Sequence, residues 1–247
     1  MRRSRRYRHG VSPATDPGPI ALVGSGEYLP QMEAVDAELL RGRAPRAVFL
    51  ATAAGQEGDA SVDRWLALGR THFQRLGVEP VPLPVVTRAD AERDDLAALV
   101  AGAGLVYLSG GDPGYLVGAL TGTAVWAAIE RAWRAGTALA GCSAGAMALG
   151  GVTPLPFGGG AVPGLGVVPQ LAVLPHFDRL RGWRPTAAAD LRAAVPAGVR
   201  VVGVDEDTAL VHLDGRWQVR GRLQVWEVGP DGAAVAGHGA GTVLPGW

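Results

Sequence analysis

Residues 137–151, TALAGCSAGAMALGG, contain the pattern in this chain that is best suited to covalent chemistry. Gly141 and Gly145 flank Ser143 in the order G-x-S-x-G. This spacing is typical of a nucleophile elbow, where a serine occupies a strained strand-to-helix corner and its neighbours need almost no side chain. The following helix would direct its first backbone N–H groups toward an oxyanion. A tight turn whose serine only caps the helix is the structural alternative, and the motif alone does not separate the two.

Cys142, the single cysteine of the chain, is a competing nucleophile in the same stretch. Centring the motif on Cys142 would put Ala140 and Ala144 where the glycines belong, so the register favours Ser143. We therefore expect Cys142 to be a small buried residue of the turn. A single cysteine also excludes a disulfide within the chain, which fits a reducing compartment and a cytoplasmic location.

An activated serine needs a general base and an acid that orients the base. His176 is the candidate base because it follows a short apolar strand and opens HFDRLRGWR, a stretch rich in charge and aromatic rings that we interpret as a loop. The other four histidines occupy positions more typical of surface or core residues: His9, His72, His212 and His238.

Three adjacent carboxylates, Asp205-Glu206-Asp207, supply the candidate acid at the carboxyl end of an apolar strand. Sites in α/β proteins gather at such strand ends, although a solvated acidic turn is the structural alternative. In an extended segment neighbouring side chains point to opposite faces, so we expect Glu206 to face away from both aspartates.

The composition of the 247-residue chain argues against a nucleic-acid or membrane partner. Lys plus Arg and Asp plus Glu are equal at 23 each, so no overall field attracts polyanions. No apolar run approaches the roughly 18 residues that cross a bilayer, and no ligand spacing indicates a metal or a cofactor. Five of the first eight residues are arginine, and we predict a disordered basic tail over residues 1–17, with a weak anion-binding arm as the alternative. Residues 18–247 are predicted to form one α/β domain.

Apolar segments alternate with amphipathic ones along the first 150 residues, which predicts a mostly parallel sheet with helices on both faces. Expected strands cover residues 19–23, 47–52, 105–108 and 138–140, with an edge strand within 78–86 because of its prolines. Expected helices cover residues 61–76, capped by Ser61, and residues 90–101, 113–120 and 123–135. Gly69 weakens the prediction for the middle of the first helix, and GSGE at residues 24–27 is interpreted as a plain turn after a strand.

The pattern changes after the elbow. Residues 150–169 are rich in glycine and proline, and we predict an irregular loop that borders or covers the site, with a plain surface connection as the alternative. A helix is expected over residues 185–194, and short strands follow from residue 199, with Asp214-Gly215 as a hairpin turn. These strands are expected to add an antiparallel layer to the same domain, since no linker separates them from it.

Four segments of the chain stand in a recognisable order: YLSGGDP, GCSAGAM, GLGVVPQLAVLPHFDRLRG and GVDEDTALV. In order and spacing they resemble the cyanophycinase and aspartyl-dipeptidase family of serine peptidases, a relative of the class I glutamine amidotransferases. The resemblance implies an α/β fold of the class I glutamine amidotransferase type and a Ser-His-Glu triad of Ser143, His176 and Glu206. It also implies that the backbone N–H groups of Gly111 and Ala144 stabilise the oxyanion.

The chain departs from this family where cyanophycinases resemble one another around the substrate. A Gln near the GGD turn is replaced by Pro113, and an Asp-Gln pair before the histidine is replaced by Leu174-Pro175. We assign substrate binding to Asp112, Arg179 and Arg181, with a solvated loop as the alternative for the arginines.

The sequence as a whole therefore predicts a serine peptidase that cleaves a small peptide or isopeptide amide through an acyl-enzyme, without a cofactor, and a substrate that bears acidic groups is one of the options. A non-catalytic relative that binds a small molecule or peptide is the alternative, and assembly as a homodimer is left open.

Overall fold

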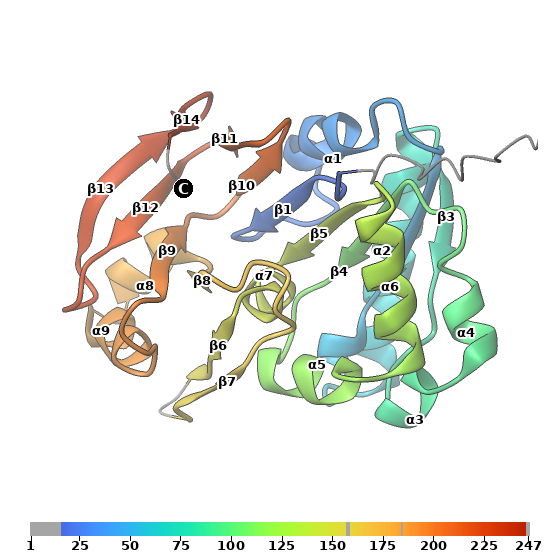
Figure 1. The fold of residues 1–247 in the computed structure, drawn as a ribbon, viewed down its shortest axis with the longest axis horizontal. Coiled ribbons are helices and arrows are strands. Elements are labelled where there is room, and N and C mark those ends of the chain that lie inside the picture. Colours follow the sequence, from blue (N-terminus) through green and yellow to red (C-terminus); the bar gives the residue numbers. More distant parts are fainter. Residues whose placement is uncertain (1–15, 157–158, 184, 246–247) are drawn as a thin grey trace, which may run out of the picture.

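The computed structural model describes residues 16–156, 159–183 and 185–245. Its main sheet has eight strands in the order β14-β11-β10-β1-β5-β4-β2-β3 (Figure 1). The central strands run parallel to one another: β1 (Ile20–Val23), β5 (Ala138–Cys142), β4 (Leu105–Leu108), β2 (Arg46–Leu50) and β3 (Glu79–Pro82). The proline-interrupted β3 lies at the sheet edge, as predicted, because proline cannot donate to a neighbouring strand.

Helices cover both faces of this sheet, which confirms the predicted fold class. Alternate strand residues such as Val23 and Phe49 form one core with α1 (Glu33–Leu40) and α2 (Asp59–Arg75). The intervening residues, such as Leu22 and Val48, form the other core with α5 (Pro113–Leu120), α6 (Ala124–Arg134) and α7 (Ala144–Leu149). This alternation follows from the two-residue period of a strand buried on both sides.

Two helix predictions need correction. The helix α2 begins at Asp59 with Gly58 as its N-cap, so Ser61 lies inside the helix and is not its cap. Gly69 does not interrupt α2: a Cβ there would lie 2.7 Å from ring carbons of Phe49, so the glycine permits close packing of the helix on β2.

The helix predicted over residues 90–101 is divided into α3 (Arg88–Ala91) and α4 (Asp94–Ala98). A capping box between Thr87 and Asp90 starts the chain into α3 earlier than expected.

The strands after residue 199 pair with one another in antiparallel fashion, which confirms that part of the prediction, but they are divided between two sheets and do not form one added layer. One group extends the main sheet next to β1 and consists of β10 (Thr208–Leu213), β11 (Arg216–Gly221) and β14 (Val243–Leu244). A second sheet has the order β13-β12-β9-β8 and contains β8 (Leu171–Leu174), β9 (Arg200–Val204), β12 (Gln224–Val228) and β13 (Ala234–Gly239). The chain crosses between the sheets at residues 205–207. The Asp214-Gly215 hairpin is confirmed, since both residues have the positive φ of a type I′ turn.

Two segments that the sequence predicts to be loops contain regular secondary structure. The segment 150–169 contains a hairpin of β6 (Val152–Pro154) and β7 (Ala161–Pro163). HFDRLRGWR contains the helix α8 (Phe177–Trp183), which is followed by α9 (Pro185–Ala193). Phe177 is fully buried under Gly203, where any Cβ would collide with its ring. A single buried aromatic residue anchors α8, and so short a helix shows no clear period in the sequence.

The predicted basic tail lies outside the described residues except for Asp16 and Pro17. Within the described ranges, no helix combines the length and apolar character that crossing a membrane requires.

Candidate active site

Ser143 occupies a strained corner between β5 and α7, with φ of 51° and ψ of −112°. This combination is unfavourable for a residue with a side chain, and such strain is found mainly at functional sites. Both flanking glycines are needed on steric grounds. A Cβ at Gly141 would collide with the backbone of Gly145, and a Cβ at Gly145 would collide with the Leu108 carbonyl oxygen. The G-x-S-x-G spacing therefore reflects close backbone contacts on both sides of the serine.

His176 lies directly opposite the serine, although it comes from the other sheet. It follows the end of β8 and also has a positive φ, 49°. Its Nε2 lies 3.1 Å from Ser143 Oγ, and its Nδ1 lies 3.0 Å from Glu206 Oε1. With the proton on Nδ1, the imidazole donates to the carboxylate and accepts from the hydroxyl. This arrangement has the geometry of a nucleophile, a base and an orienting acid.

Of the three adjacent carboxylates, only Glu206 contacts the imidazole. Asp205 is buried and accepts from Trp226 Nε1 at 3.0 Å, whereas Asp207 pairs with Arg222. The alternation expected of an extended segment does not explain why the three carboxylates have different partners, because residues 206–207 form a turn and Asp207 has a φ of 53°. The turn, rather than the period of a strand, separates the three side chains.

Besides the imidazole, Arg179 contacts the Glu206 carboxylate, and Asp178 holds the Glu206 backbone. Arg179 Nε donates to the second oxygen of the carboxylate at 3.0 Å, and the Glu206 backbone N–H donates to Asp178 Oδ1 at 2.9 Å. The hydrogen bond from His176, followed by that from Arg179, lowers the pKa of Glu206. A lowered pKa keeps the group ionised over a wider acidic range, which suits an acid whose task is to orient an imidazole.

The turn between β4 and α5 brings backbone donors toward the serine. Gly111 has a φ of +139°, and a Cβ there would collide with the Ala53 carbonyl group, so only glycine fits. Gly111 and Ala144 both line the pocket that contains Ser143. Among the described residues, neither N–H donates to a protein acceptor, so both remain available to an oxyanion.

Glu27 belongs to the site, and the sequence interpretation of GSGE as a plain turn missed it. Its side chain is buried; Oε1 accepts from the Gly110 N–H at 3.0 Å and Oε2 from the Cys142 thiol at 2.9 Å. The available signal was an acidic residue placed at the carboxyl end of β1, beside the strand that leads to the elbow. Cys142 is fully buried, as predicted, and burial together with Glu27 raises the pKa of its thiol well above the ordinary range.

A pocket of about 410 Å³ opens beside the serine. Arg179 and Pro156 line it, and Pro156 comes from the β6–β7 hairpin, so the segment 150–169 does border the site. Asp112 and Arg181 are not among its lining residues. The Asp112 carboxylate caps α5 by accepting from the Tyr115 N–H at 2.7 Å, and the Arg181 guanidinium lies 4.2 Å from the centre of the Trp226 ring.

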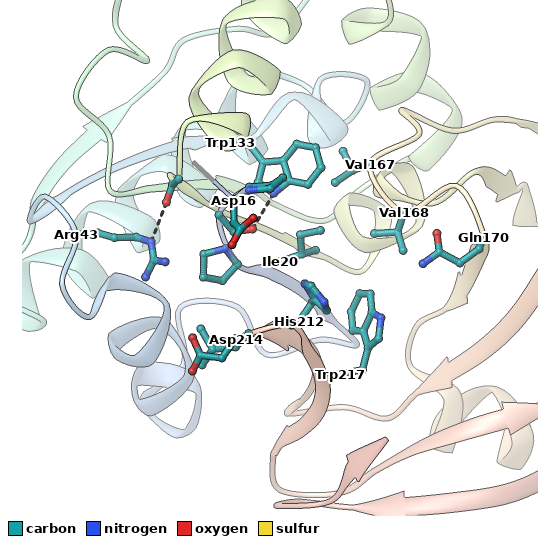
Figure 2. Close-up of a pocket in the computed structure, with 16 residues that line it drawn as sticks. Asp16, Ile20, Arg43, Trp133, Val167, Val168, Gln170, His212, Asp214 and Trp217 are labelled. Carbon is teal, nitrogen blue, oxygen red and sulfur yellow. Dashed lines mark hydrogen bonds between the residues drawn. The ribbon is translucent and has the colours of Figure 1, made fainter. Parts of the chain in front are cut away.

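A second pocket, of about 670 Å³, lies at the opposite end of the parallel strands (Figure 2). Trp133, His212 and Trp217 line it, together with the start of β1 and the β10–β11 hairpin. In the parts of the chain that the structure describes, no group of three or more His, Cys, Asp or Glu side chains is arranged to hold a metal ion.

Comparison with known proteins agrees with this geometry. Residues 20–220 match the model of a family described as peptidase family S51. The cyanophycinase of Trichormus variabilis (strain ATCC 29413 / PCC 7937) is 35% identical over 171 residues, which cover 64% of this chain and 56% of that protein. The cyanophycinase of Synechococcus elongatus is 33% identical over 180 residues, covering 66% of this chain and 55% of the relative. The chain thus spans little more than half the length of these curated relatives.

Two solved structures are similar to most of the chain. The crystal structure of a peptidase from an acI-B1 Actinobacterium has a TM-score of 0.83 and 37% identity, and the match covers 92% of this chain and 96% of that one. A crystal structure from Listeria monocytogenes EGD-e has a TM-score of 0.62 at 16% identity and covers 83% of this chain and 98% of that one, which supports the fold alone.

Proposed function

The chain belongs to peptidase family S51, and from that premise we propose that it is a serine peptidase that cleaves a small peptide or isopeptide amide. One observation carries the proposal. Ser143 Oγ, the His176 imidazole and the Glu206 carboxylate form a continuous chain of hydrogen bonds of 3.1 Å and 3.0 Å at a strained strand-to-helix corner. A serine that only caps a helix needs neither the base nor the strain.

In the proposed reaction, Ser143 Oγ attacks the scissile carbonyl carbon while His176 Nε2 takes the hydroxyl proton. Glu206 keeps the proton of the resting imidazole on Nδ1 and stabilises the imidazolium that forms. The N–H groups of Gly111 and Ala144 stabilise the oxyanion, each contributing about 3 kcal/mol to the barrier reduction. Nε2 then gives its proton to the leaving amine, and water clears the acyl-enzyme by the same sequence of steps.

The substrate is less determined than the reaction. The curated relatives are named cyanophycinases, whereas the solved relative at 37% identity is named only as a peptidase. Pro113 and Leu174-Pro175 stand where cyanophycinases share polar residues, and Pro113 and Pro175 line the pocket. We therefore propose a small peptide substrate without assigning cyanophycin.

A fluorophosphonate probe tests the proposal directly, since it labels only an activated serine. We expect the intact protein to be labelled and to hydrolyse members of a dipeptide panel. Ser143→Ala should abolish both, and the matched variant of the neighbouring residue, Cys142→Ala, should retain both. Absence of labelling in the intact protein would indicate a binding relative, and hydrolysis that survives in Ser143→Ala would exclude the serine mechanism.

A further inference from the structure

We propose that Glu27 positions the oxyanion turn, residues 109–111, beside the nucleophile; this inference rests on the proposed function. Glu27 belongs to the turn that follows β1, and it is only 8% exposed. Among the described residues, its carboxylate bonds to neither Ser143 nor His176. Glu27 therefore acts on the reaction through the groups that it holds, which makes it a positioning residue.

The carboxylate of Glu27 joins two segments that both end at the site. Its Oε1 accepts from the Gly110 N–H at 3.0 Å, and its Oε2 accepts from the Cys142 thiol at 2.9 Å. Gly110 directly precedes Gly111, whose N–H we assign to the oxyanion, and Cys142 directly precedes Ser143. A thiol is a weak donor, so the bond to the Gly110 N–H is the stronger of the two and carries most of the effect.

Tyr28, the next residue along the chain, contacts the same oxyanion turn. Its hydroxyl oxygen lies 2.7 Å from Ser109 Oγ, and both residues are buried. Tyr28 has a positive φ of 67°, and its carbonyl oxygen accepts from Arg75 Nη2 at 3.2 Å. The consecutive residues 27 and 28 thus hold the consecutive residues 110 and 109, so the contact of Glu27 is part of a wider attachment between two turns.

The turn that carries Glu27 is itself fixed to the elements around the site. The Gly24 N–H donates to the Thr208 carbonyl oxygen at 2.9 Å. One residue earlier, the Val23 carbonyl oxygen accepts from the Ser143 N–H at 2.9 Å. The carboxylate of Glu27 therefore extends from backbone that is already bonded to the nucleophile, and a group held in this way can fix its neighbours precisely.

The oxyanion turn has little space in which to move while Glu27 is present. A Cβ at Gly110 would lie 3.0 Å from Glu27 Oε1 and 3.3 Å from Ser143 Cβ, and a Cβ at Gly111 would collide with the Ala53 carbonyl group. An oxyanion donor acts only when it lies about 2.7–3.1 Å from the oxygen. Removing the carboxylate opens one side of this enclosure, and a shift of the turn would then weaken the Gly111 contact.

Three substitutions at Glu27 separate position from charge. Glu27→Ala removes both contacts and should lower kcat by about 10- to 100-fold, at or below the loss of one oxyanion donor, with KM nearly unchanged. Glu27→Gln keeps an acceptor for the Gly110 N–H at the same reach and should recover most of this loss. Glu27→Asp keeps the charge but is one methylene shorter, so kcat should fall by about tenfold. The opposite order, an active Asp variant and an inactive Gln variant, would overturn the inference.

Two inhibitors give a readout that a purely structural role would not move. The best hydrolysed dipeptide of the panel is converted to its aldehyde, which forms a tetrahedral adduct with an oxyanion, and to the matching alcohol, which does not. The affinity of the aldehyde should fall in Glu27→Ala in parallel with kcat, because both depend on the oxyanion donors. The alcohol should bind the variant and the unmodified protein equally. Equal losses of affinity for both inhibitors would contradict positioning of the oxyanion turn.

Asp36→Ala is the matched control for stability. Asp36 is a buried carboxylate on α1, and His72 Nε2 lies 2.7 Å from its Oδ2. The substitution leaves a buried imidazole without its carboxylate partner, so the melting temperature should fall while kcat stays unchanged in the folded protein. A Glu27→Ala variant that behaves in the same way would overturn the inference. If Glu27→Ala does not fold, the order of the Gln and Asp variants decides. Failure of the proposed function is distinct, since the unmodified protein would then not be labelled by the fluorophosphonate.

Discussion

The two ends of the parallel strands carry pockets of opposite character. The pocket at the amino end is the larger of the two, at about 670 Å³, and two of its polar side chains, those of Arg43 and Trp133, donate to backbone carbonyl groups. Trp133 Nε1 donates to the Gly18 carbonyl oxygen and Arg43 Nε to that of Gly136 (Figure 2). The pocket at the carboxyl end is about 410 Å³, and there the side chains bond to one another. The volume of a pocket therefore does not identify a catalytic site, whereas a continuous chain of hydrogen bonds between side chains does indicate one.

Backbone strain follows the same division. Among the described residues, the non-glycine positions with positive φ include Tyr28, Ser143, His176 and Asp207, which all follow strands at the carboxyl end. At the amino end such a residue occurs in the β10–β11 turn, where Asp214 has the conformation that a type I′ hairpin needs. Strain at the amino end is explained by a turn, and strain at the carboxyl end accompanies the hydrogen-bonded side chains.

The largest expected effect is that of Glu206→Gln. The amide no longer selects the imidazole tautomer with the proton on Nδ1, so kcat should fall by about two to four orders of magnitude. Steady-state hydrolysis and fluorophosphonate labelling measure the change. Asp207→Asn is the matched control, because asparagine tolerates the positive φ and keeps an oxygen that can accept from the exposed Arg222 guanidinium. Comparable losses in both variants would contradict the assignment of Glu206.

Gly111→Ala should have the next largest effect. The added Cβ collides with the Ala53 carbonyl group and should displace the backbone N–H that we assign to the oxyanion. We expect kcat to fall by about 100-fold, the order found when one oxyanion donor is lost. Gly122→Ala is the control: its φ is also positive, at 74°, but nothing lies within 4 Å of the new Cβ. It should lose about 1–2 kcal/mol of stability and no activity. Equal kcat in the two variants would show that Gly111 has no special role.

The sequence predicted the main sheet and the elbow because these features depend on neighbouring residues. The apolar runs and the glycines at 141 and 145 act within a few positions of Ser143. The sequence failed where contacts are distant. Glu27 meets Gly110 and Cys142 across 83 and 115 positions, and no local pattern announces that pairing. The division of the strands after residue 199 between two sheets was also missed, because nothing in the sequence of residues 205–207 distinguishes a crossing between sheets from an ordinary acidic turn.

A smaller effect is expected at Cys142, which lies one residue from the nucleophile. Burial raises the pKa of its thiol, and the neighbouring Glu27 carboxylate raises it further, so the thiolate is scarce at neutral pH. Native protein should therefore react slowly with a disulfide reagent, and protein unfolded in denaturant should titrate one thiol. Iodoacetamide should leave hydrolysis unchanged over the same period. Rapid alkylation with loss of activity would transfer the nucleophile from Ser143 to Cys142.

The smallest effect is expected at the amino-end pocket, where His212→Gln should leave hydrolysis unchanged. His212 packs against Trp217, with ring centres 5.0 Å apart, and burial lowers the pKa of its imidazole. The unfolded chain then binds a proton more readily than the folded one, so His212 lowers stability as the pH falls through about 6.5. The variant lacks this group, and its melting temperature should decrease less between about pH 7.5 and about pH 5.0 than that of the unmodified protein. A fall in kcat with an unchanged melting profile would mean that the two ends of the sheet are functionally connected.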